Sequence, residues 1–234
     1  MKNLLLASTS TVHGGAYLDY LLSELEALFS ETDDIIFIPY ARPGGISHDQ
    51  YTEKAQNAFQ KIGKSIRGLH TFEDPAAAIK NAKGVFTGGG NTFVLVSQLY
   101  NFNIMPALRE AIFDGLPYLG TSAGSNIAGV TMQTTNDMPI IYPPSFKTLG
   151  AIPFNINPHY LDPDPDSKHM GETRETRIGE FHAYNTLPVV GIREGSWLRV
   201  QDDTIMLGGE LSARIFEKDK EAVEKASGSE IHFD

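Results

Sequence analysis

The chain has 234 residues, of which 41% are hydrophobic and 21% are charged, and its formal net charge is −10. This composition is typical of a globular protein, and a chain of this length buries roughly 70–75% of its unfolded surface, so we expect a single domain over residues 1–234. The 19 Lys and Arg residues are scattered, which argues against a nucleic-acid partner. The absence of cysteine excludes disulfides, thiolate nucleophiles and Cys-ligated metals, and it fits a cytoplasmic location.

No segment of the sequence is typical of a membrane or targeting element. The apolar stretch from Leu4 to Ala7 is shorter than the core of a signal peptide, and no run approaches the length of a membrane span. We therefore expect no membrane partner, and the sequence leaves a homodimer open. Because the chain is acidic, any anionic ligand would need a local Arg or Lys to offset the overall field.

Short apolar runs alternate with helical patterns along the first half of the chain. The runs begin at Asn3, Ile35, Ser65, Gly84 and Leu116. Leucines at helical spacing predict a helix over 16–29, Ser47 is suited to cap the next helix, and Asp74 followed by Pro75 marks another helix start. This alternation predicts an α/β fold with a mostly parallel sheet and helices on both faces, in which ligands bind beyond the carboxyl ends of the strands.

The segment from Thr134 to Pro165 holds more than half of the chain's 13 prolines. Proline excludes long helices, so this segment predicts loops and edge strands of the kind that form the walls of active sites. A helix over 171–181 is expected next. Short strands should then follow, beginning at Pro188, Ser196, Thr204 and Ala213.

The stretch "GTSAGSN" at positions 120–126 contains a Gly-x-Ser-x-Gly pattern between an apolar strand and an apolar helix start. A nucleophilic serine on such a turn needs small neighbours, and the N–H of the next residue, here Ala123, faces a developing oxyanion. The alternative is a tight turn whose serine only caps the helix. A second cluster, Gly88-Gly89-Gly90, fails as a dinucleotide-binding motif because Phe93 stands where the last glycine belongs. It is suited instead to donate backbone N–H groups to a carbonyl, or simply to provide a loop with positive φ.

A nucleophilic serine needs a base and an acid to orient that base. Among the histidines, His159 in "NINPHY" lies at a predicted strand end, and His232 near the C-terminus would suit a general α/β-hydrolase. The remaining histidines are His13, His48, His70, His169 and His182. The candidate acids are Asp137 in "TTNDMP" and Glu194 in "GIREGSW", although solvated turn carboxylates are the commoner outcome beside Gly or Pro.

A metal site is weakly suggested by "HYLDPDPDSKHMGE", where Asp162, Asp164 and Asp166 lie between two histidines. The pattern does not fit an EF-hand loop, and a zinc site from His159 and His169 has no recognised spacing.

Taken together and in order, "GGGNTF", "GTSAGSN", "TTNDMP", "INPHY", "GETRE" and "REGSW" resemble the peptidase E family of α-aspartyl dipeptidases. The resemblance extends from the first strand to the strand at Thr204 and implies a fold similar to class I glutamine amidotransferases. It also implies cleavage of dipeptides with an N-terminal aspartate, without a metal or other cofactor. Other serine hydrolases on the same fold, such as an esterase, remain the alternative.

The resemblance assigns roles to individual residues. It implies that Ser122 is the nucleophile and His159 the base. It places the third catalytic residue at Asp137, with Glu194 as a rival, and makes Gly89 an oxyanion donor beside Ala123. Arg174 in "GETRE" matches the residue that binds the aspartate side chain of the substrate, whereas without the resemblance it is more simply a solvated helix residue paired with Glu172 or Glu175. Thr121 and Ser125 depart from the usual family residues, so the shape of the pocket is expected to differ there.

Overall fold

The structure, a computed structural model, describes residues 1–164, 166, 168 and 171–233. Its larger sheet has the strand order β3-β2-β4-β5-β1-β8-β9. These strands are β1 (Asn3–Ala7), β2 (Asp34–Ile38), β3 (Ser65–Gly68), β4 (Val85–Thr87), β5 (Tyr118–Thr121), β8 (Trp197–Gln201) and β9 (Thr204–Gly208). The strands from β3 to β1 pair in parallel, and β8 and β9 close the edge in antiparallel fashion.

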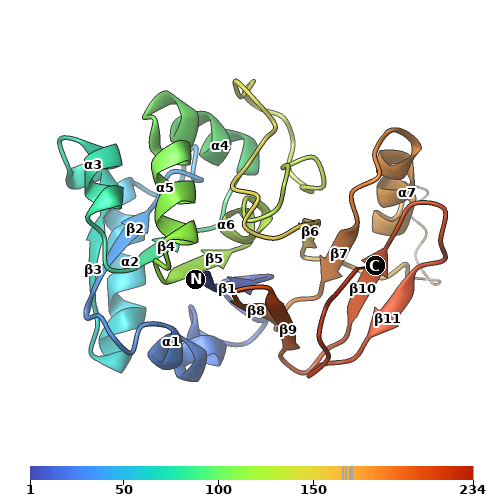
Figure 1. Cartoon of the computed structure of the whole chain (residues 1–234), viewed down its shortest axis with the longest axis horizontal. Helices are drawn as coiled ribbons and strands as arrows, with labels where there is room; N and C mark the ends of the chain where they lie inside the picture. The colour runs from blue at the N-terminus through green and yellow to red at the C-terminus, as the bar shows by residue number, and fades with distance from the viewer. Residues whose placement is uncertain (165, 167, 169–170, 234) are drawn as a thin grey trace.

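A smaller sheet of order β11-β10-β7-β6 lies beside the larger one (Figure 1). Its strands are β6 (Asn155–Pro158), β7 (Val189–Ile192), β10 (Ala213–Phe216) and β11 (Val223–Lys225). Strands β6 and β7 pair in parallel, so their carboxyl ends meet at one edge. This edge becomes important because the residues that follow β6 and β7 include two of the predicted site residues.

Seven α-helices connect the strands in the described residues. They are α1 (Leu22–Leu28), α2 (His48–Phe59), α3 (Pro75–Lys80), α4 (Thr92–Asn101), α5 (Ile104–Phe113), α6 (Ala123–Asn126) and α7 (Arg174–Tyr184). Short 3-10 turns are found at Asp19–Leu21, Gln60–Ile62 and Leu69–Thr71. Within the described part of the chain, no helix is both long enough and apolar enough to cross a membrane.

The larger sheet is covered by helices on both faces, as the alternating pattern predicts. Along β1, Leu4 and Leu6 belong to the apolar cluster that contains residues of α3, α4 and α5, whereas Leu5 and Ala7 belong to the cluster with α1 and α2. Successive side chains of a strand point to opposite faces, so a strand that is apolar at every position is buried on both sides. The mostly parallel α/β fold predicted from the sequence is thereby confirmed.

The helix boundaries follow their caps. Ser47 forms a capping box with Gln50 at the start of α2, and the Asp74 carboxylate accepts the Ala77 N–H at the start of α3, both as predicted. The helix expected over 16–29 is shorter, because Leu18 has a left-handed φ of 62° and only a 3-10 turn precedes α1. The helix expected from residue 171 begins later, at Arg174, where Thr173 caps it.

Candidate active site

Ser122 lies on a sharp turn between β5 and α6 with φ 54° and ψ −111°, a region that non-glycine residues rarely adopt. The two glycines of the motif make this turn sterically accessible. A Cβ on Gly120 would lie 2.5 Å from the Gly124 carbonyl oxygen, and a Cβ on Gly124 would lie 2.2 Å from the Thr87 carbonyl oxygen. The turn therefore requires glycine at both positions, and it lifts a partly accessible serine to the carboxyl edge of the sheet.

Thr121 and Ser125, where the shape of the pocket was expected to differ, lie beneath the turn. Thr121 and Ser125 are both completely buried. The Ser125 hydroxyl lies 2.7 Å from the Ala7 carbonyl oxygen and 2.8 Å from that of Gly120. Ser125 thus supports the turn from inside the core, and neither of the two buried side chains contributes directly to the accessible surface around Ser122.

His159 directly follows β6 and also has a left-handed φ of 53°. Ser8 holds it in place, since the Ser8 hydroxyl accepts the His159 N–H at 2.8 Å and donates to the Ile192 carbonyl at 2.7 Å. Ser8 is completely buried just beyond β1. Ser8 is not among the site residues predicted from the sequence, although a small polar residue directly after a buried central strand is a usable signal.

Three sequence-distant side chains form one hydrogen-bonded chain. The Ser122 Oγ lies 2.8 Å from His159 Nε2, and His159 Nδ1 lies 2.6 Å from Glu194 Oε1. Glu194 follows β7, the parallel neighbour of β6, which brings it to the same sheet edge as His159. A serine, an imidazole and a carboxylate in this order can activate the serine as a nucleophile and hold the imidazole in the required tautomer.

Asp137, the other candidate acid, lies elsewhere. Within the described residues, its Oδ2 accepts hydrogen bonds from the Thr92 N–H and hydroxyl, both at 2.7 Å, and from the Thr135 hydroxyl at 3.0 Å. Asp137 therefore binds the N-terminus of α4, next to the Gly-rich loop, rather than the imidazole of His159. The carboxylate at His159 Nδ1 is that of Glu194. The family resemblance implies Asp137 as the third catalytic residue, with Glu194 as its rival.

The segment before Asp137 is bound to β6 by side-chain amides. Asn157 donates to the Thr134 carbonyl and the Asn136 side chain, and Asn136 donates to the Pro158 carbonyl at 2.6 Å. Because Pro158 immediately precedes His159, these bonds connect the position of the base to the loop that ends at Asp137. The asparagines of "NINP" were not singled out in the sequence, and their role depends on a contact with a segment about twenty residues away.

The Gly-rich loop approaches the serine closely. A Cβ on Gly89 would lie 2.9 Å from Ser122 Cβ and 3.5 Å from Ser122 Oγ, so only glycine leaves room there. The Ser122 carbonyl accepts the N–H groups of Ser125 and Asn126. Because C=O and N–H point in opposite directions in a trans peptide, the Ala123 N–H points out of the helix. The two predicted oxyanion donors thus belong to backbone segments on either side of the serine.

Arg174 begins α7 and lines a cavity of about 490 Å³ together with Asn136. Burial and the neighbouring Arg177 lower the pKa of Arg174, while Asp137 opposes this shift. The acids expected as its partners are used by other residues, since Glu172 pairs with Arg177 and Glu175 with Arg214. Among the described residues, no carboxylate is within ion-pair distance of Arg174. A partly buried guanidinium of this kind can bind a carboxylate ligand.

Residues 4–208 match the family model described as Peptidase family S51. The chain belongs to this family. The resemblance drawn from the sequence motifs is thereby confirmed, and the chain is a peptidase of the hydrolase class.

Relatives of this peptidase match over nearly its whole length. A protein named peptidase E from Streptomyces coelicolor is 49% identical, and the match covers 98% of this chain and 93% of the relative. A protein named probable alpha-aspartyl dipeptidase from Drosophila melanogaster is 46% identical over 99% of this chain and 97% of its own. The solved structure of a peptidase from an acI-B1 actinobacterium, 17% identical, has a TM-score of 0.74 with coverage of 100% and 97%, which shows the same fold.

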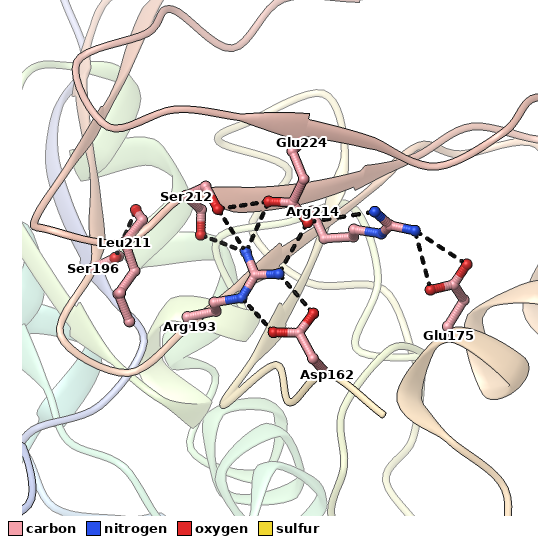
Figure 2. A network of polar contacts seen from close by, with 8 residues as sticks. All are labelled: Asp162, Glu175, Arg193, Ser196, Leu211, Ser212, Arg214 and Glu224. Atoms are coloured by element: carbon pink, nitrogen blue, oxygen red, sulfur yellow. Dashed lines mark hydrogen bonds and ion pairs between the residues drawn. The ribbon is translucent and has the colours of Figure 1, made fainter. Parts of the chain in front are cut away.

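An ion-pair network of the peptidase is centred on Arg193, which directly follows β7 (Figure 2). Arg193 binds both oxygens of Asp162, at 2.8 and 2.6 Å, and both oxygens of Glu224, at 3.0 and 2.9 Å. Glu224 also contacts Arg214, which reaches Glu175 on α7. The charge of Asp162, an acidic residue close to His159 in the sequence, is therefore paired with that of Arg193.

Among the described residues, no histidine other than His159 is hydrogen-bonded to Ser122. His182 is 9% exposed, and its Nε2 lies 3.0 Å from the Leu187 carbonyl oxygen. His232, the rival base, is exposed near the C-terminus. His169, the second residue of the weakly suggested zinc pair, lies outside the described residues. Among the residues that are described, no group of three or more His, Cys, Asp or Glu side chains is arranged to hold a metal ion.

Proposed function

We propose that this peptidase is a serine-type dipeptidase that hydrolyses dipeptides with an N-terminal aspartate. The observation that carries the proposal is the hydrogen-bonded chain from Ser122 Oγ through His159 to Glu194. In this proposal Ser122 is the nucleophile, His159 the general base and Glu194 the residue that orients His159. The name of the Drosophila melanogaster relative, an alpha-aspartyl dipeptidase, supports the substrate class.

The reaction begins when His159 Nε2 accepts the Ser122 proton and the serine oxygen attacks the carbonyl carbon of the aspartyl residue. The tetrahedral oxyanion is bound by the N–H groups of Ala123 and Gly89, and each such donor contributes roughly 3–4 kcal/mol. The protonated imidazole then gives its proton to the departing amine as the peptide bond breaks. Water, deprotonated by His159, attacks the aspartyl ester, the ester bond to Ser122 breaks and free aspartate leaves.

Specificity is proposed to reside in Arg174. Two parallel charge-assisted hydrogen bonds would bind the substrate carboxylate in a geometry that lysine cannot reproduce. The absence of a carboxylate partner for Arg174 among the described residues supports this role. Replacing the substrate aspartate by asparagine would leave the guanidinium without its partner, at a cost of about 2–5 kcal/mol.

The test compares hydrolysis of Asp-Leu, Asn-Leu and Glu-Leu by the wild type, by Ser122→Ala and by the control Ser30→Ala, an exposed serine distant in the sequence. We expect cleavage of Asp-Leu alone, its loss in Ser122→Ala and its retention in Ser30→Ala. Equal cleavage of all three dipeptides would contradict the role of Arg174 and favour a serine hydrolase of different specificity. Cleavage by Ser122→Ala at the wild-type rate would contradict the nucleophile.

A further inference from the structure

Two buried tyrosines donate hydrogen bonds to the backbone on either side of Ser122. The Tyr51 hydroxyl donates to the Gly89 carbonyl at 3.1 Å, and the Tyr118 hydroxyl donates to the Gly124 carbonyl at 2.8 Å. Tyr51 is 2% exposed and Tyr118 is completely buried. Phenylalanine would fill the same apolar space at both positions, so the two hydroxyl groups need an explanation of their own.

We propose that Tyr51 and Tyr118 are positioning residues that hold the two oxyanion-binding segments at the correct distance from Ser122. This inference rests on the proposed function, because it assigns Gly89 and Ala123 as the donors to the oxyanion. Tyr51 acts through the Gly-rich loop and Tyr118 through the first turn of α6. Neither side chain is proposed to touch the substrate.

On the first side, the Gly-rich loop is held at several points. The Gly88 N–H donates to the Ile38 carbonyl, and the Asn91 N–H donates to the Ala41 carbonyl. The Gly89 carbonyl lies between these two anchors. Within the described residues, it accepts its hydrogen bond from the Tyr51 hydroxyl. The Gly89 N–H belongs to the Gly88–Gly89 peptide, which lies between the anchored Gly88 N–H and the Gly89 carbonyl that Tyr51 binds. Because the peptide units on both sides of it are held, the orientation of the Gly89 N–H depends in part on the Tyr51 bond.

The ring of Tyr51 is itself held rigidly. Phe37 packs edge-on against it with ring centroids 4.9 Å apart, and the Arg42 guanidinium lies 5.3 Å from the ring centroid. Gly88 leaves room for the hydroxyl, because a Cβ there would lie 2.6 Å from it. A donor with so little freedom can hold a carbonyl in one orientation without a large loss of side-chain entropy.

On the second side, Tyr118 supports the turn that carries the nucleophile. Gly124 belongs to the four-residue helix α6, whose first N–H is that of Ala123. The hydroxyl bond fixes the Gly124 carbonyl within this first turn. Burial raises the pKa of Tyr118 well above its ordinary value, so the hydroxyl stays protonated and remains a donor.

The two tyrosines reach the site from opposite faces of the larger sheet. Tyr51 lies on α2 and belongs to the apolar cluster with α1, whereas Tyr118 lies on β5 and belongs to the cluster with α4 and α5 (Figure 1). The two donor segments are therefore tied independently to the two halves of the core. Because the core holds both donor segments in place before the reaction, they reorganise little when the oxyanion forms. This preorganisation is the condition for effective electrostatic stabilisation.

The test compares Tyr51→Phe and Tyr118→Phe with the matched control Tyr100→Phe. Tyr100 also donates its hydroxyl to a backbone carbonyl, that of Lys147 at 2.9 Å, but at the far end of α4. For Asp-Leu hydrolysis we expect kcat to fall about 10-fold in each of the first two variants, less than the roughly 10²- to 10³-fold cost of deleting an oxyanion donor. In Tyr51→Phe and Tyr118→Phe, KM should stay within about twofold of the wild type and the pH profile of kcat/KM should keep its shape, because ground-state binding and the His159–Glu194 pair are untouched. The activity of the control Tyr100→Phe should also stay within about twofold of the wild type.

Further measurements separate positioning from stability. The affinity for Asp-Leu is measured by calorimetry in Ser122→Ala, alone and combined with each tyrosine change, and should not move. Thermal unfolding is recorded for every variant, and kinetics are measured well below the lowest midpoint. The inference is overturned if both variants keep the wild-type kcat, if the loss falls on substrate affinity, or if neither variant folds. Absence of Asp-Xaa cleavage by the wild type would instead overturn the proposed function.

Discussion

The two arginines Arg174 and Arg193 have opposite electrostatic surroundings. Arg193 already has ion-pair partners, because its guanidinium contacts the two carboxylates of Asp162 and Glu224. Arg174 is partly buried, and no carboxylate contacts it among the described residues. The pKa values reflect the difference, since Asp162 and Glu224 raise the pKa of Arg193, whereas burial lowers that of Arg174.

This difference indicates which charges serve structure and which are available to a ligand. The Arg193 network joins the segment after His159, the end of β7 and the strands β10 and β11 (Figure 2). It therefore stabilises the backbone segments that surround the site. It also reaches α7 through Arg214 and Glu175, next to Arg174. Substitutions near Ser122 and Arg174 should therefore affect activity more than stability. Substitutions in the Arg193 network should affect stability more than activity.

The largest effect on activity is expected from Glu194→Ala compared with Asp137→Ala. Removing the partner of His159 Nδ1 should lower kcat by roughly 10³-fold, while the unfolding free energy changes little because Glu194 is exposed. Asp137→Ala removes the acceptor at the start of α4 and should cost about 0.5–2 kcal/mol of stability with a smaller loss of kcat. Steady-state kinetics and urea unfolding measure both. A larger kcat loss in Asp137→Ala would reverse the assignment of the acid.

The next largest effect on activity is expected from Arg174→Met. We expect kcat/KM for Asp-Leu to fall by at least about 30-fold, the equivalent of 2 kcal/mol, because the substrate carboxylate loses its partner. The midpoint of thermal unfolding should stay the same or rise, since no ion pair is broken among the described residues. Arg174→Lys serves as the control for charge without bidentate geometry and should recover only part of the activity. Full activity in Arg174→Met would show that another group binds the aspartate.

Arg193→Met should mainly reduce stability. It leaves Asp162 and Glu224 without their shared partner, and we expect a loss of about 1–3 kcal/mol in the free energy of unfolding. The exposed Lys83→Met, which breaks no ion pair among the described residues, is the control for removal of a positive charge. Urea denaturation followed by circular dichroism gives both values. A stability equal to that of Lys83→Met would mean that the network makes no net contribution to stability.

The smallest effect is a pH dependence of stability. The hydrogen bond to Arg193 lowers the pKa of Glu224 from 4.5 to about 2. A lowered pKa in the folded state stabilises the protein above the unfolded value, and this contribution disappears as the pH falls from 4.5 toward 2. The difference in unfolding midpoint between the wild type and Glu224→Gln should therefore shrink over this range. A constant difference would show that Glu224 acts through its hydrogen bonds alone.

Local patterns were sufficient for much of the fold. Apolar runs fixed β1, β2 and β5 to within a few residues, and Ser47 and Asp74 cap helices as their positions indicate. The exceptions have local causes, such as the left-handed Leu18 that shortens the first helix. These features could be predicted because periodicity and capping depend on neighbours within a few residues.

The sequence by itself determined the α/β class, the glycine-flanked Ser122 and a short set of partners for it. Only the tertiary structure decided among these partners, because the parallel pairing of β6 and β7 brings Glu194 to His159 and leaves Asp137 at the start of α4. The same holds for Arg174 and Arg193, whose local sequences each contain nearby acids. Which acid an arginine meets depends on strand order and loop packing over long sequence distances, and local composition does not contain that information.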